Sequence, residues 1–326
     1  MTFVIWLKRS KALLPLGISF LFVLFLFRAL DWKGAVKLFN PDISFPSVLL
    51  FVALVSTIVC MYGLRWNHLL GGALDTKSYM VAAVLCMGGN MILPARGGDI
   101  LRVHYSHKVG HVSHAMAFGR LFIEKVIELI TLVFVGALAV FTLSGTQASS
   151  NDYLLSAASI SLATVTGAVL LIKFGNRLVV RWVHQAFKLL GLSERIERNL
   201  VHMIQDVGVR LTFALTLKPS LLTIMMWLMV YVPSYMLISH MVGVGLAYPE
   251  AMLVLFAAAL GLMIPAAPSG VGTFHASVVT AFLFLGRSAE EGLLVGTAIH
   301  LFSFVAYVTP MALLSGFWFF KREAID

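Results

Sequence analysis

A charged stretch at residues 90–102 interrupts an apolar chain and holds groups that suit an anion. A proline and two glycines break the apolar run there, and two arginines and an aspartate fall within seven residues. The guanidinium fork matches the geometry of phosphate, and glycines let the backbone present amide N–H groups to an anion. The carboxylate is placed to orient either arginine. The candidate binding residues are Arg96, Gly97, Gly98, Asp99 and Arg102.

A second charged group lies in the first half of the apolar run Phe118–Leu143. Arg120, Glu124 and Glu128 are four residues apart and share one face of a helix, with Lys125 beside them. Charges inside a span seek partners in the bundle interior. Because cations outnumber acids in the two groups together, we expect an anion-binding cleft open to the cytoplasm. The alternative is self-neutralisation, in which arginines and carboxylates pair and nothing is bound.

The stretch from Pro265 to Gly272 is a second break, and it is nearly uncharged. Its prolines and glycines free backbone amides and carbonyls from helical hydrogen bonds, and nearby hydroxyl and imidazole groups are available to them. We expect this break to line a substrate path; the alternative is a turn that only reverses the chain. The candidate residues are Pro268, Ser269, Gly270, Gly272 and His275.

No pattern typical of an enzyme or a metal site occurs, so we expect neither catalysis nor a metal or cofactor. The common hydrolase, metalloprotease and nucleotide-binding motifs are missing from the sequence. His104, His107, His111 and His114 have the spacing of one helical face, but a glycine interrupts them and no carboxylate or cysteine accompanies them. We interpret them as interfacial, and His300, alone within a span, as a hydrogen-bonded packing residue.

The composition is that of a polytopic α-helical membrane protein. Of 326 residues, 60% are hydrophobic and 12% are charged, whereas soluble domains have about 25% charged residues. The net charge of +9 fits lysines and arginines at cytoplasmic loops beside anionic lipid, so nucleic acid is not an expected partner. Cys60 and Cys86 both fall in apolar runs, which predicts reduced thiols.

Six apolar runs approach the length of about 20 residues that crosses the hydrocarbon. Two other apolar segments are shorter and interrupted, which predicts re-entrant hairpins at Tyr79–Leu93 and Ala251–Leu285. The expected spans are Leu13–Leu30 (an uncleaved first helix), Pro46–Leu64, Phe118–Leu143, Tyr153–Ile172, Ser220–Met241 and Gly292–Gly316.

The distribution of lysine and arginine predicts that both termini face the cytoplasm and that the protein lies in the cell membrane. Most of the 24 cationic residues then lie inside, provided that the two short segments return to the side from which they enter. The segments placed inside are the N-terminus, the loop Arg65–Ser78, Pro94–Arg120, Lys173–Lys218 and the C-terminus, and Arg287–Glu291 is placed outside. The cytoplasmic segment 173–218 alternates cations with large apolar residues, which predicts a basic amphipathic element on the lipid surface.

The spans divide the chain, a single membrane domain, into two inverted halves, residues 13–143 and 153–316. Each half has two spans, a re-entrant hairpin and a third span, and three crossings invert the second half. Broken segments at matching positions of inverted halves indicate the site of a transporter. The alternative is that two breaks coincide by chance.

Three motifs in this order resemble the flippase-like membrane domain of lysylphosphatidylglycerol synthases, over about Leu13 to Gly316. They are Pro94-Ala-Arg96-Gly-Gly98-Asp99-Ile-Leu-Arg102, Glu124-Lys125 with Glu128, and Pro265-Ala-Ala-Pro268-Ser-Gly270-Val-Gly272-Thr-Phe-His275. The family more often has glutamate at positions 99 and 275 and arginine at position 125. The resemblance covers the membrane region of these synthases and not their soluble lysyl-transfer domain. It therefore implies that the chain corresponds to the part of the synthases that translocates lipid. Relatives are linked to phospholipids, hopanoids and polyprenyl-linked sugars.

We therefore expect a lipid flippase or transporter that moves an anionic or zwitterionic membrane lipid between leaflets through a cationic cleft. Two alternatives stay open: an integral-membrane lipid-modifying enzyme, and an accessory subunit partnered with a membrane glycosyltransferase. Gly292 and Gly296 have the spacing of close helix packing, so a homodimer is a further alternative.

Overall fold

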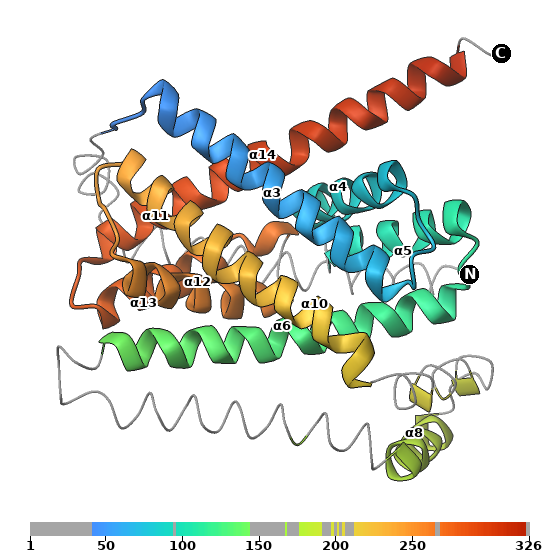
Figure 1. The fold of residues 1–326 in the computed structure, drawn as a ribbon. Coiled ribbons are helices and arrows are strands. Elements are labelled where there is room, and N and C mark those ends of the chain that lie inside the picture. The colour runs from blue at the N-terminus through green and yellow to red at the C-terminus, as the bar shows by residue number, and fades with distance from the viewer. Residues whose placement is uncertain are drawn as a thin grey trace, which may run out of the picture. The chain divides into compact units, whose positions relative to one another are not determined.

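A computed structural model describes residues 41–93, 96–143, 167, 176–190, 197, 198, 201, 204, 205, 212–264 and 268–323. All regular structure in these residues is helical (Figure 1), which confirms the predicted all-α class for the described part of the chain. The predicted span Leu13–Leu30 lies outside the described residues, and so does the predicted span Tyr153–Ile172 except for Gly167.

Four described helical stretches are long and apolar enough to cross a membrane, and each overlaps a predicted span. They are Phe45–Leu69 (α3), His114–Leu143 (α6), Leu215–Met241, and Ala289–Leu314 within α14 (Ala289–Glu323). Their length and apolar composition make the chain a membrane protein, as predicted.

The stretch Leu215–Met241 is not one regular helix. It joins α10 (Phe213–Met226), the π-helical turn η2 (Trp227–Tyr231) and α11 (Val232–Met241). Pro233 follows the π turn, and proline has no N–H for the hydrogen bond of a regular helix. The wider turn accommodates that missing bond within the span.

Shorter helices make up the remaining described elements. They are α4 (Thr76–Ile92), α5 (Gly97–Gly110), α8 (Asn176–Leu190), α12 (Tyr248–Met263), η3 (Pro268–Gly270) and α13 (Thr273–Phe284). Helix α8 lies in the predicted amphipathic segment and exposes both Arg181 and Trp182. Asp75 caps α4 by accepting a hydrogen bond from the backbone N–H of Ser78 at 2.8 Å. Hydrogen bonds from the side chain and the backbone of Ser78 hold the pKa of Asp75 below its usual range.

Contacts divide the chain into two compact units that do not coincide with the predicted halves. Unit 1 takes its described residues from Met1–Ile58, Val84–Leu101 and Leu228–Asp326. Unit 2 takes them from Val59–Ala83 and Arg102–Trp227. Each unit therefore combines segments from both halves of the sequence.

In unit 1, α12 and α13 form a tight helical hairpin, and α13 also packs against α14 (Figure 1). A Cβ on Gly261 would lie 2.7 Å from the backbone carbonyl oxygen of Thr273, so only glycine allows this close approach. With 16 and 12 residues, the helices are about 24 and 18 Å long at a rise of about 1.5 Å per residue. Each is shorter than the hydrocarbon thickness of about 30 Å.

In unit 2, α6 packs along α10, and a buried apolar cluster lies among the ends of the neighbouring helices. The cluster consists of Trp66, Leu70, Leu74, Ala82, Val103, Val112 and Ala117. Smaller apolar contacts continue it along α6, where Ile123 and Ile127 pack with Leu69.

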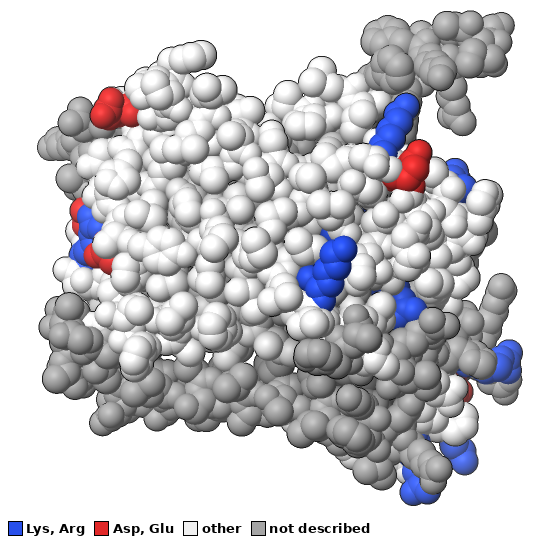
Figure 2. All heavy atoms as spheres, viewed as in Figure 1, with Lys and Arg blue, Asp and Glu red and all other residues white. Residues whose placement is uncertain are grey.

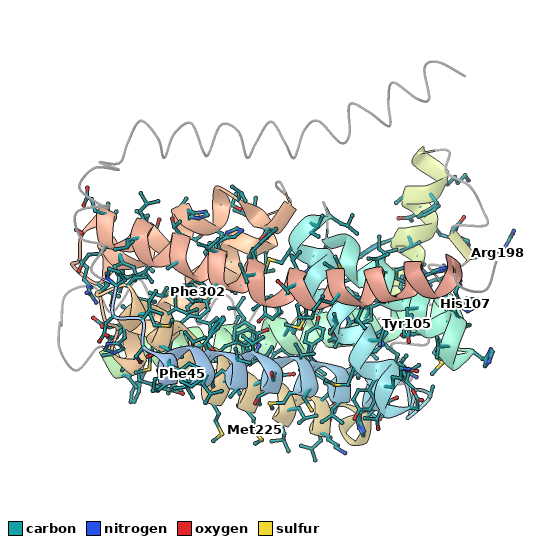
Figure 3. The ribbon with its side chains drawn as sticks, turned by 90° about the horizontal axis from the view of Figure 1, so that it is seen from above. Phe45, Tyr105, His107, Arg198, Met225 and Phe302 are labelled. Atoms are coloured by element: carbon teal, nitrogen blue, oxygen red, sulfur yellow. The ribbon has the colours of Figure 1, made fainter. Side chains whose placement is uncertain are left out.

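Large apolar side chains are exposed on the outer faces of the described helices. Phe45 and Phe141 are 81% and 73% exposed, and Met225 points away from the helices in Figure 3. On the face drawn in Figure 2, charged residues are sparse among uncharged ones. Apolar surface of this extent suits contact with hydrocarbon.

Candidate functional site

Arg102 and Glu124 form a buried, bidentate ion pair in unit 2. The guanidinium Nη1 and Nη2 atoms donate to Oε2 and Oε1 at 3.2 and 2.9 Å, and both side chains are 0% exposed. The guanidinium carbon also lies 4.0 Å from the ring centre of Trp66 and 4.9 Å from that of Tyr62. This pair joins α5 to α6, and the fork of Arg102 is occupied by the protein itself.

Arg65 extends this network, although the sequence analysis placed it in a cytoplasmic loop. It is fully buried on α3, and its Nη2 lies 3.1 Å from Oε1 of Glu124 and also donates to Glu128. Its Nη1 donates to Oγ1 of Thr223 at 2.9 Å. The loop assignment was wrong because α3 continues to Leu69, beyond the apolar run from which the span was predicted.

The other predicted charges of α6 lie on the same helix as Glu124. Lys125 donates to Oε2 of Glu128 at 3.0 Å and lies 3.9 Å from Oε1 of Glu124. Arg120 is 2% exposed. Self-neutralisation therefore describes Arg102, Glu124 and Glu128 of the predicted cleft, with Arg65 as a partner that the prediction did not include, and the pairs hold the helices together.

The first break belongs to unit 1, where Arg96 and Asp99 meet at the start of α5. Arg96 has a φ of 57°, a left-handed conformation that is uncommon without glycine. Its Nε donates to Oδ2 of Asp99 at 3.3 Å, and the thiol of Cys86 donates to Oδ1 of the same carboxylate at 3.0 Å. The side chain of Arg96 is 48% exposed and that of Asp99 only 8%. Asp99 thus holds the Arg96 side chain, whose outer part remains accessible. Pro94 lies outside the described residues.

Gly97 and Gly98 allow α4 and α5 to pack closely. A Cβ on Gly98 would lie 2.0 Å from the carbonyl oxygen of Cys86 and 2.5 Å from the backbone N of Asn90. A Cβ on Gly97 would lie 2.7 Å from Cβ of Leu93. On that side of both glycines the chain itself occupies the space that the sequence analysis assigned to an anion.

The second break, η3, brings Ser269 and His300 together in unit 1. Ser269, Gly270 and Gly272 all have positive φ, at 61°, 65° and 95°. Oγ of Ser269 lies 2.8 Å from Nε2 of His300 and 3.0 Å from Sδ of Met91. Because Met91 lies near the C-terminal end of α4, Ser269 links the second break to the helix end that precedes the first.

His275 stacks on His300, with ring centres 5.1 Å apart and ring planes 14° apart. The edge of Phe274 also meets His300, at 5.3 Å and 88°. His300 is hydrogen-bonded, as predicted, but it also connects Ser269 to His275. Residues 265–267 lie outside the described residues, and the side chain of Pro268 is not described.

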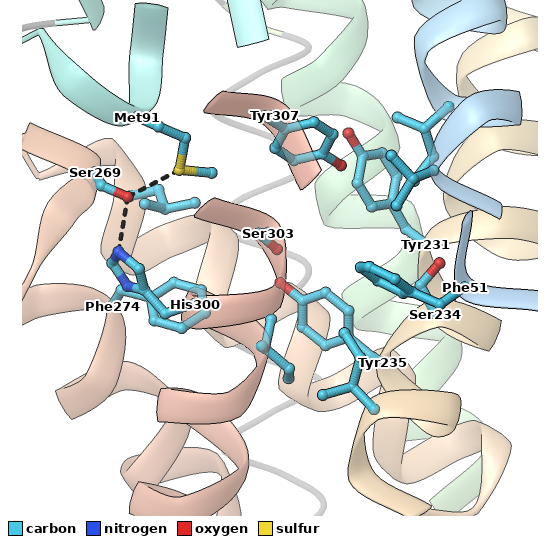
Figure 4. A pocket seen from close by; sticks show the side chains of 15 residues that line it. Phe51, Met91, Tyr231, Ser234, Tyr235, Ser269, Phe274, His300, Ser303 and Tyr307 are labelled. Carbon is cyan, nitrogen blue, oxygen red and sulfur yellow. Dashed lines mark hydrogen bonds between the residues drawn. The ribbon is translucent and has the colours of Figure 1, made fainter. Parts of the chain in front are cut away.

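A cavity of about 160 Å³ lies in unit 1 beside the second break. Figure 4 shows Ser269 and His300 on one side of it, the hydroxyls of Tyr235 and Ser303 directed toward each other, and those of Tyr231 and Tyr307 likewise. The sequence analysis missed these residues because no motif joins them. The available signal was three tyrosines in the apolar stretches that become η2, α11 and α14.

The histidine series at the end of α5 does not share one helix. His104 and His107 lie on α5, His111 has a φ of 51° in the linker, and His114 begins α6. The rings of His107 and His114 are 3.9 Å apart. Among the described residues no group of three or more metal-ligating side chains is placed to hold a metal ion.

The long apolar helices and the charges buried among them define an α-helical membrane protein. The family described as Lysylphosphatidylglycerol synthase TM region matches residues 12–310, and the chain belongs to this family. The resemblance seen in the sequence motifs is thereby confirmed over nearly the whole chain. Comparisons with curated proteins and with solved structures found no match.

Proposed function

We propose that this protein moves lipids with anionic or zwitterionic headgroups between the leaflets of the cell membrane, without a covalent step. The observation that carries the proposal is the contact between Ser269 and Met91, which joins two broken helical elements beside a cavity lined by apolar side chains, hydroxyls and an imidazole. Broken helices that meet inside a membrane domain are typical of transporter binding sites.

The broken backbone needs a polar surrounding at membrane depth. Backbone without helical hydrogen bonds is tolerated there only inside protein or along a water-filled cavity. The pairs α4–α5 and α12–α13 each consist of two short helices joined by such a break, and in the proposal both enter the bilayer as re-entrant hairpins. The cavity beside Ser269 has hydroxyls and an imidazole in its lining, next to the second break.

Arg96 is the cation assigned to the lipid phosphate. It is 48% exposed and immediately precedes α5, whose first amide groups carry the positive end of the helix dipole. Asp99 limits the movement of the guanidinium through its bond to Nε. In the proposal, the buried pairs of Arg65 and Arg102 with Glu124 hold the helices and take no part in lipid binding.

The test uses purified protein in liposomes that contain a trace of phospholipid with a fluorescent acyl chain. Bleaching of the outer leaflet with dithionite reports lipid that arrives from the inner leaflet. Wild type is expected to increase the rate over empty liposomes, and Arg96→Ala to lower it by about 10-fold, the order of one charge-assisted hydrogen bond.

Lys77→Ala, at an exposed lysine in the first turn of α4, is the matched control and should transport as wild type does. Elution as one species in detergent checks that each variant is folded. Transport no faster than in empty liposomes for every lipid tried, or an Arg96→Ala rate equal to that of wild type, would contradict the proposal.

A further inference from the structure

The cavity beside Ser269 has a lining that selects a particular kind of headgroup. We infer that it binds an uncharged, hydroxyl-rich group, a polyol or a sugar, carried on the phosphate of the transported lipid. This inference rests on the proposed function and names the substrate class within it.

The polar atoms of the lining are hydroxyls and an imidazole. Tyr235, Ser303 and Tyr307 contribute hydroxyls, and the Ser269–His300 pair adds a further hydroxyl and the imidazole (Figure 4). A hydroxyl both donates and accepts hydrogen bonds, and so does neutral imidazole. A polyol has the same dual character, so its hydroxyls match these groups as donors and as acceptors.

None of the described residues that line the cavity is Asp, Glu, Lys or Arg. An ammonium group placed here would have no carboxylate beside it, and a phosphate would have no cation. Burying an ion without a counter-charge costs far more than burying a hydroxyl that is hydrogen-bonded. The lining therefore favours a neutral group and disfavours the charged ends of ethanolamine or lysyl headgroups.

The remaining wall is apolar and partly aromatic, with Phe51 and Phe274 among its members. Small-ligand sites commonly combine such walls with a few placed polar groups. A cavity of about 160 Å³ exceeds the room that one water requires, about 10–15 Å³ in this measure. It accommodates several waters or one headgroup of comparable size.

The π-helical turn η2 gives independent support for a ligand site. It ends at Tyr231, a lining residue, and Oγ of Ser234 donates to the carbonyl oxygen of Val230 at 2.7 Å. That bond gives the carbonyl of Val230 a partner within the irregular turn. Turns of this kind occur frequently at functional sites.

The experiment compares lipids that have identical acyl chains and differ only in the headgroup. Phosphatidylinositol and phosphatidylglycerol carry a polyol on the phosphate, phosphatidylethanolamine carries an ammonium, and phosphatidic acid carries neither. Each is measured in the dithionite assay and also by the rise in melting temperature that it gives the protein in detergent. Wild type should prefer the two polyol lipids in both measurements.

Tyr235→Phe and Tyr307→Phe remove one hydroxyl each and keep the ring. Each should lower the transport rate of polyol lipids about 3- to 10-fold, the order of one hydrogen bond, and should reduce the rise in melting temperature that these lipids give. Both measurements should change little for phosphatidic acid. Tyr248→Phe is the matched control, because that hydroxyl donates to the carbonyl oxygen of Leu228 outside the cavity lining.

The two proposals fail differently. If no lipid moves faster than in empty liposomes, the transport proposal fails, and the melting temperatures alone then decide whether the cavity prefers polyols. If lipids move but the polyol lipids have no advantage, or if Tyr235→Phe and Tyr307→Phe weaken all lipids equally, the cavity inference is overturned while transport stands.

Discussion

At the scale of single residues, the buried charges of unit 2 have a structural role. Glu124 forms ion pairs with two arginines on different helices, Arg65 and Arg102, and has 0% exposure. A carboxylate removed from water in this way is stable only while its partners are present. The network therefore fixes the register of α3, α5 and α6 relative to one another.

Glu124→Gln tests this role. The substitution keeps the shape of the side chain but leaves two guanidinium groups without their shared charge, so we expect a loss of about 3–5 kcal/mol in the free energy of unfolding. Denaturant or thermal unfolding of purified protein in detergent measures it. Glu290→Gln, in the first turn of α14, should cost less than about 1 kcal/mol; equal losses in the two variants would show that the network is not a clamp.

Arg65 marks the limit of prediction at this scale. The sequence pattern grouped the α6 charges on one helix face, and Glu124 does lie beside Glu128 and Lys125. It did not show that α3 continues beyond its apolar run and carries an arginine into the same network. An arginine at the end of a span is equally compatible with a loop, and only tertiary packing decides between the two.

At the scale of elements, the crossing of α4 and α5 depends on small residues. Gly98 lies so close to Cys86 that no side chain fits between them. The sequence analysis recognised the break after α4 but assigned residues 94–120 to the cytoplasm. It did not recognise α5 as a packed helix, because the many charged and histidine residues of α5 interrupt the apolar pattern by which a packed helix is recognised in a sequence.

Gly98→Ala is expected to separate α4 from α5. Its Cβ would lie 2.0 Å from a backbone oxygen, so the helices must move, at a cost of about 1–3 kcal/mol or more. Thermal unfolding and elution volume measure the effect. Gly167→Ala provides the control, because a Cβ there would meet no atom of the described residues within 4 Å; a Gly98→Ala melting temperature equal to that of the control would refute the close crossing.

At this scale, the long apolar helices were the feature that the sequence predicted best. The four described stretches that are long and apolar enough to cross a membrane overlap predicted spans, because the length of an apolar run reports directly on hydrocarbon thickness. The π turn η2 was not predicted, since Pro233 alone does not distinguish a kink from a wider turn. The cavity was unpredictable for a similar reason: it depends on which helix faces meet.

At the scale of the whole molecule, sidedness remains a prediction from the distribution of lysine and arginine. It assigns residues 94–120 to the cytoplasmic side and residues 287–291 to the outside. With α5 as the returning arm of a re-entrant hairpin, the end of α5 at Lys108 is predicted to lie on the cytoplasmic side. Lys108→Cys and Ser288→Cys, both at exposed positions, should react with an impermeant maleimide from opposite sides of sealed cells. Wild type is the control, because its two cysteines are buried or partly buried. Labelling of both positions from the same side would contradict the predicted topology.

The central claim is that lipid headgroups enter the cavity where the two broken elements meet. The most direct measurement is photo-crosslinking of the reconstituted protein with a phospholipid that carries a diazirine on its headgroup, followed by mass spectrometry of the peptides. The account predicts labelling of cavity-lining positions such as Tyr235 and Ser303, suppressed by excess unlabelled phosphatidylinositol. Labelling confined to outward-facing positions such as Phe141, unaffected by competitor, would contradict it.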